Sequence, residues 1–197
     1  MLDGARFNAL VVGGGAVATR KAQSLLDGGM AVTVVAPEIC SELMELAARR
    51  SRLKLVTRMY QPSDIVQANI IVAATNDSRV NTLVARDATT RGLLVNVADD
   101  PTAGNFVTPS VHRSGELTIA VSSGRTPAAA AAIRAEIARR FDGRYDTAIR
   151  SLRALREKLL GTGRREEWQR ASRELITEKF CEDVEQGRLE AQVGSWR

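Results

Sequence analysis

One glycine-rich turn constrains the fold more than any other stretch of the chain. The apolar run Ala9 to Val12 leads into Gly13-Gly14-Gly15, and helical spacing of small and apolar residues begins directly afterwards. A second apolar run, Ala31 to Val35, follows the stop signal Asp27-Gly28-Gly29. This order predicts a strand, a tight turn, a helix and a second, parallel strand, which is a βαβ unit.

The glycines are spaced as in the dinucleotide-binding fingerprint, Gly13-x-Gly15-x-x-Ala18. Gly13 permits the sharp turn, Gly15 lets a pyrophosphate approach the backbone, and the small Ala18 lets the helix pack closely on the strand. The helix start, at Ala16 and Val17, supplies N–H groups and a positive dipole end for phosphate. A purely structural turn is the alternative interpretation of the same residues.

The end of the second strand bears on the choice of cofactor. Pro37 and Glu38 follow it, and the next arginine after them is Arg49. An acid here holds the ribose hydroxyls of NAD, whereas an arginine would favour the phosphate of NADP. NAD is therefore the expected cofactor. Glu38 could equally be an acid in the first turn of the following helix, which we expect over 37–50.

Three further apolar runs, 53–57, 70–74 and 93–97, predict the remaining strands of a parallel sheet, with a helical turn at 62–68. Thr75 and Asn76 follow the strand at 70–74, so we expect them to lie at the cofactor edge and to contact the nicotinamide half. Asn76 or Asp77 could also cap the next helix, and the two roles are compatible.

Two adjacent acids, Asp99 and Asp100, follow the strand at 93–97. An acid at this edge can act as a general base, and an Asp-Asp-Pro loop is also ordinary turn chemistry. From the residues alone the turn interpretation is the stronger one.

The pattern changes beyond Pro109. A turn at Ser114-Gly115 leads into a strand up to Val121, and a loop at 122–127 opens a helix up to Phe141. This second glycine and hydroxyl loop is either an anion site or an ordinary helix cap. His112 is the only histidine, and we expect it at the surface of a turn. Residues 145–189 should be amphipathic helix, and 191–197 a frayed end.

Composition narrows the function classes. The 197 residues carry a formal charge of +5, but only 4% are aromatic and no base-reading module is recognisable, which argues against nucleic acid as a partner. No apolar run is long enough to span a membrane, and there is no signal-peptide pattern. Cys40 and Cys181 belong to no metal-ligand cluster, so we expect no metal site and a reducing cytoplasm.

Taken in order, these motifs closely resemble the precorrin-2 dehydrogenase family, which includes the N-terminal module of siroheme synthase. The resemblance rests on six segments: 11–22, 32–37, 73–77, Asn96-Val97-x-Asp99, Phe106-x-x-Pro109-Ser110, and 117–124.

The resemblance implies an α/β fold in three parts. These are an NAD-binding Rossmann domain at 1–110, a small dimerisation region of a strand plus a helix at 111–144, and a helical tetrapyrrole-binding domain at 145–197. It also implies an intertwined homodimer and, because no methyltransferase half is present in these residues, a stand-alone enzyme.

The implied reaction is the NAD-dependent oxidation of precorrin-2 to sirohydrochlorin, and some members also insert iron. Asp99 matches the family aspartate that acts in catalysis. Gly13, Gly15, Ala16, Val17, Pro37 and Glu38 match cofactor contacts, and Asn96 and Ser123 fall at substrate positions. Ser123 also falls where some members carry a phosphorylated serine. A basic protein suits a substrate with eight carboxylates. A non-catalytic NAD-sensing module is the alternative.

Overall fold

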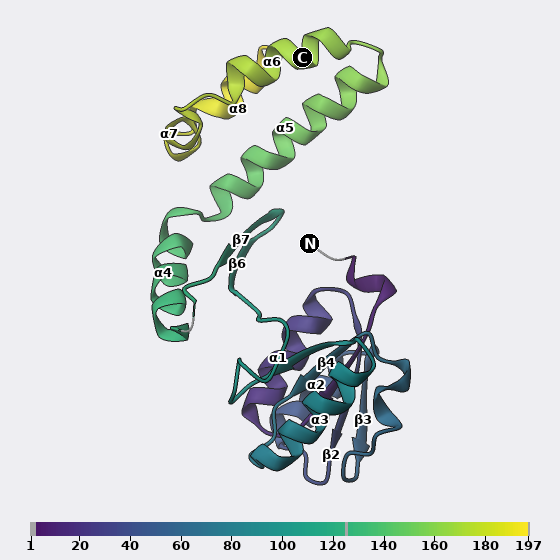
Figure 1. Ribbon diagram of the computed structural model, residues 1–197. Coiled ribbons are helices and arrows are strands. Elements are labelled where there is room, and N and C mark those ends of the chain that lie inside the picture. The colour runs from purple at the N-terminus through teal and green to yellow at the C-terminus, as the bar shows by residue number, and fades with distance from the viewer. Residues whose placement is uncertain (1–2, 125, 197) are drawn as a thin grey trace. The chain divides into compact units, whose positions relative to one another are not determined.

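The computed structural model describes residues 3–124 and 126–196, which form two compact units, the first ending at Thr108 and the second beginning at Pro109. The first unit is built on a five-stranded parallel sheet in the order β3-β2-β1-β4-β5 (Figure 1). Its strands are β1 (Asn8–Val12), β2 (Ala31–Ala36), β3 (Leu53–Thr57), β4 (Ile70–Ala73) and β5 (Leu94–Val97). All five predicted strands are confirmed.

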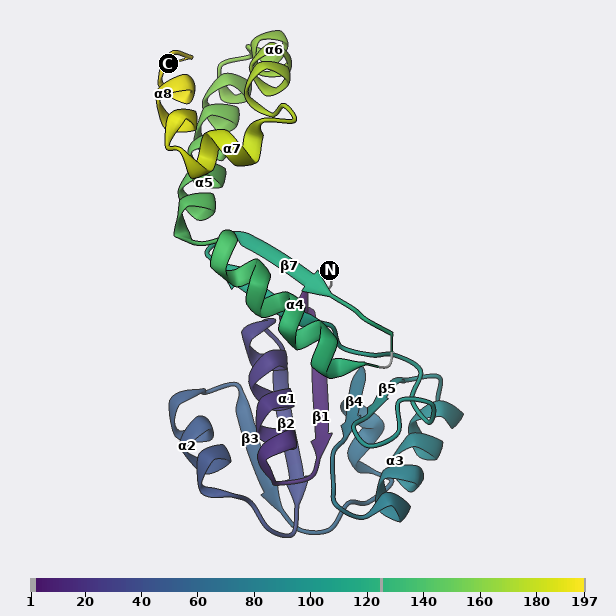
Figure 2. The same ribbon diagram turned by 90° about the vertical axis from the view of Figure 1, so that its left-hand side faces the viewer.

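Helices cover both faces of this sheet. α1 (Ala16–Asp27) and α2 (Ser41–Arg49) lie along one face, as Figure 2 shows, and α3 (Ser78–Thr90) packs on the other. A short 3₁₀ helix, Asp64–Gln67, stands where the helical turn was expected. The chain order reverses between β1 and β4, which is the switch point where ligands of such sheets bind.

The prediction for α2 was wrong at its start. The helix begins at Ser41 rather than at Pro37, because the backbone N–H of Cys40 donates to the carbonyl of Gly14 at 2.9 Å. This bond ties Cys40, whose backbone is extended, to the glycine turn, and residues 37–40 form a bend and loop rather than a helix. Glu38 therefore lies before the helix and is not its first-turn acid; Glu42 is.

The loop after β5 returns along the free edge of this strand. The Asn105 amide accepts from the N–H of Val95 at 2.8 Å and donates to the carbonyl of Leu93 at 2.9 Å. Its own backbone N–H donates to the carbonyl of Val95 at 2.9 Å. Asn105 therefore pairs with β5 much as a neighbouring strand does.

The second unit begins with an antiparallel hairpin of β6 (Ser110–Ser114) and β7 (Leu117–Val121), followed by α4 (Pro127–Arg140). The sequence predicted only one strand here, so β6 is a correction. Hairpin formation puts His112 on a strand rather than in a turn. The side chain of Asp146 accepts from the N–H of Glu116 at 2.8 Å and so holds the hairpin tip.

Among the described residues, the second unit also contains α5 (Gly143–Gly161), α6 (Arg165–Leu175), α7 (Phe180–Glu185) and α8 (Arg188–Gly194). α6 to α8 pack against the long α5 around a core that contains Leu159 and Leu189. The expected frayed end is wrong: α8 extends to Gly194, and Val193 is only 2% exposed. Leu189 and Val193 are four residues apart, so both lie on the buried face of α8 and hold this end of the chain in a helix.

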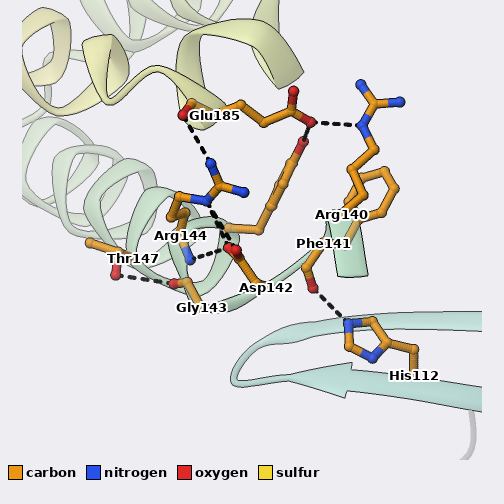
Figure 3. A network of polar contacts seen from close by, with 9 residues as sticks. His112, Arg140, Phe141, Asp142, Gly143, Arg144, Thr147 and Glu185 are labelled. Carbon is orange, nitrogen blue, oxygen red and sulfur yellow. Dashed lines mark hydrogen bonds and ion pairs between the residues drawn. The ribbon is translucent and has the colours of Figure 1, made fainter. Parts of the chain in front are cut away.

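A polar network joins α5 to α7 within the second unit (Figure 3). Glu185 accepts hydrogen bonds from Arg140 at 2.7 Å and from the Tyr145 hydroxyl at 2.8 Å, and its backbone carbonyl accepts from Arg144 at 2.9 Å. His112 Nε2 lies 2.6 Å from the carbonyl oxygen of Phe141. The contact with Phe141 gives His112 a structural role.

Candidate functional site

The glycine turn is tightly packed on two sides and open on the third. Gly13 has a φ of 128°, and a Cβ there would lie 2.3 Å from the carbonyl oxygen of Ala74. A Cβ at Gly14 would lie 1.9 Å from the carbonyl oxygen of Glu38, whereas a Cβ at Gly15 would meet nothing within 4 Å. Only the first two glycines are required by packing, so the space beside Gly15 is left for a ligand.

The start of α1 fits a phosphate group. Gly15 is the extended N-cap residue, and no side chain caps the helix. Ala16 and Val17 are exposed, and Ala18 is fully buried against the sheet, as predicted from the fingerprint. Uncapped N–H groups and the positive end of the helix dipole favour an anion at this position.

Pro37 and Glu38 lie beside this turn at the end of β2 and are exposed. The carbonyl oxygen of Glu38 lies close against Gly14, and the residue is exposed. Of the two interpretations of Glu38, the first-turn acid is wrong, and the ribose contact stays a prediction.

Thr75 and Asn76 follow β4, next to the glycine turn. Asp77, not Asn76, caps α3, since its carboxylate accepts from the N–H of Arg79 at 2.9 Å. Hydrogen bonds from the Arg79 side chain lower the pKa of Asp77 to about 2. Asn76 is exposed, and Thr75 is partly buried. Both therefore lie at the carboxyl edge of the sheet, as expected.

The two adjacent acids have different surroundings. Asp100 closes a turn, since its Oδ1 accepts from the N–H of Thr102 at 2.8 Å and from the Thr102 hydroxyl at 2.6 Å. Asp99 is exposed, and its Oδ1 accepts from the amide Nδ2 of Asn81 at 2.9 Å. The turn interpretation therefore describes Asp100, and Asp99 is the acid at the open edge.

Asn81 is a site residue that sequence reasoning missed. It lies in the first turn of α3 and is 1% exposed. The sequence pattern could have identified it, because Asn81 lies on the same helix face as the buried Val84, Ala85 and Ala88. A polar residue on an otherwise apolar helix face must satisfy its amide inside the protein.

Asn96 lies on β5 with its side chain inside the protein, 5% exposed. Its Nδ2 donates to the carbonyl of Phe106 at 3.0 Å, while its buried Oδ1 has no hydrogen-bond partner among residues 3–124 and 126–196. Val95 and Val97 belong to the cluster around α3, so Asn96 faces the opposite side of the sheet.

Ser123 belongs to the second unit. Its hydroxyl donates to the carbonyl of Thr126 at 2.5 Å, which closes the turn before α4. Neither Ser123 nor Thr126 caps the helix through its side chain. Within the first unit, the structure brings these expected site residues to one edge of the sheet: Gly13, Gly15, Ala16, Val17, Pro37, Glu38, Thr75, Asn76 and Asp99.

Comparison with known proteins agrees with this geometry. A family model described as "Putative NAD(P)-binding" matches residues 1–110. Siroheme synthase of Chromobacterium violaceum is 44% identical over 129 residues, which cover 65% of this chain and 27% of that protein. Siroheme synthase of Methylococcus capsulatus is 36% identical over 192 residues, which cover 92% of this chain and 40% of that protein. The chain thus spans less than half the length of these relatives.

Among solved structures, SirC, a precorrin-2 dehydrogenase, superposes with a TM-score of 0.76 at 29% identity, covering 99% of this chain and 98% of SirC. The parallel sheet, the glycine turn and the matched family model define an NAD(P)-binding protein of the Rossmann type. More narrowly, the chain belongs to the family that contains precorrin-2 dehydrogenase and the N-terminal module of siroheme synthase.

Proposed function

We propose that this protein oxidises precorrin-2 to sirohydrochlorin with NAD, using Asp99 as the general base. The observation that supports this most directly is the placement of an exposed carboxylate, held by a buried amide, at the same sheet edge as an uncapped helix start. The family relationship supports the choice of substrate.

The residues of the first unit fit NAD. When bound, NAD accepts a hydride from the substrate carbon that is oxidised. The glycine turn and the α1 N-terminus would hold its pyrophosphate, and Glu38 its ribose hydroxyls. Thr75 and Asn76 would contact the nicotinamide end.

Asp99 would take the proton that leaves the substrate as the hydride departs, so that two electrons and two hydrogens are removed in all. A carboxylate that accepts a hydrogen bond from Asn81 on one oxygen retains further acceptor capacity for that proton. Positioned general bases contribute about 10²–10⁴ in rate.

The test is a coupled assay with a matched pair of variants. Purified protein, enzymatically generated precorrin-2 and NAD are mixed without oxygen, and NADH and sirohydrochlorin are followed together. Asp99→Asn should lower kcat by about 10²-fold or more while NAD binding is retained. Asp100→Asn should keep kcat, because an asparagine side chain can still accept from Thr102. Absence of turnover with intact NAD binding would instead indicate a sensing module.

The proposal extends to iron insertion into sirohydrochlorin. Metal entry into a tetrapyrrole releases two pyrrole N–H protons, and the exposed Asp99 carboxylate is available to accept one. Adding Fe²⁺ to the same cuvette after the oxidation is complete tests this. If the sirohydrochlorin spectrum disappears with the original protein but not with Asp99→Asn, iron insertion is supported. If the spectrum stays unchanged with the original protein, the protein is limited to dehydrogenation.

We also propose a homodimer formed through the hairpin and α4. In α4 only Ala130 is buried, Ile133 is 48% exposed, and no residue of β6 or β7 is buried. A helix and hairpin with so little buried surface gain stability by packing against a second copy. Sedimentation equilibrium should give twice the chain mass, and Ile133→Glu should shift the protein towards monomer.

A further inference from the structure

The Asn81 side chain is hydrogen-bonded through both its amide nitrogen and its oxygen. Its Oδ1 accepts from the backbone N–H of Thr75 at 3.1 Å and lies 2.8 Å from the Thr75 hydroxyl, whose single proton also has the carbonyl of Asp77 within reach at 2.9 Å. Its Nδ2 donates to the carbonyl of Thr75 at 3.1 Å and to Asp99 Oδ1 at 2.9 Å. Both donor positions of the amide are therefore used, and its oxygen accepts at least the Thr75 N–H.

These contacts also determine which way the amide points. If its oxygen and nitrogen were exchanged, the NH₂ group would face the N–H of Thr75, and the oxygen would face both a carbonyl and the Asp99 carboxylate. The backbone of Thr75 therefore forces an N–H donor towards Asp99. The side chain is 1% exposed, so water does not compete for these bonds.

Asn81 thus connects two loops that follow different strands, the loop after β4 and the loop after β5. Asp99 lies on the second of these loops. Its side chain is exposed, so packing against neighbouring residues does not fix its position. The bond to Asn81 is the contact that ties the carboxylate to the rigid start of α3.

We infer that Asn81 is a positioning residue, which holds the Asp99 carboxylate at a fixed place relative to Thr75 and hence to the cofactor edge. This inference rests on the proposed function of Asp99. A base displaced by about 1 Å can lose about 10²-fold in rate, so one buried amide has a large effect on turnover.

Asn81→Asp is the informative variant. The new side chain keeps an oxygen for the two Thr75 donors but places a carboxylate oxygen where Asn81 donates to Asp99. Asn105→Asp is the control for the same chemical change at an exposed position, because the Asn105 amide also bonds two backbone groups, Val95 N–H and Leu93 carbonyl, but does not bond Asp99.

The first measurement separates kcat from NAD affinity. Asn81→Asp should lower kcat by about 10²-fold and change the NAD Kd less than about threefold. Asn105→Asp should leave kcat within about threefold of the original, whatever it does to stability. Equal losses of kcat in the two variants would show a general structural effect and overturn the inference.

The second measurement needs no turnover. In a double-mutant cycle followed by thermal unfolding, Asp99→Asn should recover part of the stability lost in Asn81→Asp, because a donor and an acceptor then face each other again. Additive losses would overturn the inference. If the original protein fails to oxidise precorrin-2, the proposed function fails, and this cycle alone decides whether Asn81 holds Asp99.

Discussion

The three consecutive glycines give a prediction that separates folding from cofactor binding. A methyl group added at Gly14 would lie 1.9 Å from the backbone carbonyl oxygen of Glu38 and 3.0 Å from the Cβ of Ala36. Neither neighbour can rotate away, since the segment is tied to Gly14 by the Cys40 N–H. Gly14→Ala should therefore destabilise the first unit at the upper end of the overpacking range, by about 3 kcal/mol.

Gly15→Ala is the matched control for the fold. Its Cβ meets nothing within 4 Å, and its φ of −96° suits any residue. The free energy of unfolding should stay within about 1 kcal/mol of the original. NAD affinity should nevertheless fall by about tenfold or more, because the methyl group occupies the approach of the pyrophosphate to the backbone.

Native-state hydrogen exchange of the β1 and β4 amides measures the first effect, and isothermal titration with NAD measures the second. A loss of 3 kcal/mol corresponds to about a 10²-fold loss of protection in Gly14→Ala. The reasoning is refuted if Gly15→Ala binds NAD with unchanged affinity, or if Gly14→Ala keeps full protection.

Further predictions concern the packing and the pH response. Ala18→Leu should destabilise the first unit by about 1–3 kcal/mol in thermal unfolding, because Ala18 is fully buried between α1 and the sheet. Leu159→Ala should cost about 2–5 kcal/mol in the second unit, where Leu159 is fully buried. Hydrogen bonds from Arg140 and then Tyr145 lower the pKa of Glu185, so its contribution to stability is present above its unfolded pKa of about 4.3 and is lost as the pH falls below it. Glu185→Gln should therefore lower the melting temperature at neutral pH and flatten its fall between about pH 5 and pH 3.

The parts of the fold that sequence reasoning predicted well depend on local patterns. Continuous apolar runs indicated all five parallel strands, and the glycine spacing located the turn and α1. The start of α2 was wrong because a tertiary contact, from Cys40 to Gly14, overrides the local preference for a helix after Pro37. The strand β6 was missed because the residues around His112 show no strong alternation, and pairing with β7 determines their conformation.

At the candidate site, too, local patterns predicted some features and tertiary contacts determined the others. The spacing Asn96-x-x-Asp99 pointed to the correct loop, but the different surroundings of Asp99 and Asp100 depend on Asn81 and Thr102, and only the folded chain shows them. The middle glycine, Gly14, was given no role, although its packing is tighter than that of Gly13. The roles of Asn96 and Ser123 in substrate binding, the three-part division at 110 and 144, and a cytoplasmic location stay predictions. None of the helices within 3–124 and 126–196 is long and apolar enough to cross a membrane.

The pairing of Asn105 with β5 has a consequence for solubility. An unpaired outer strand offers its N–H and carbonyl groups to any other extended chain, which is a common route to aggregation. Here one asparagine occupies both groups of Val95, and the adjacent Gly104 comes so close that an added Cβ would lie 2.7 Å from the Val95 carbonyl. The loop that begins with Asp99 thus also covers the outer edge of β5. Substitutions of Gly104 or Asn105 should therefore lower the yield of soluble protein more than they lower kcat.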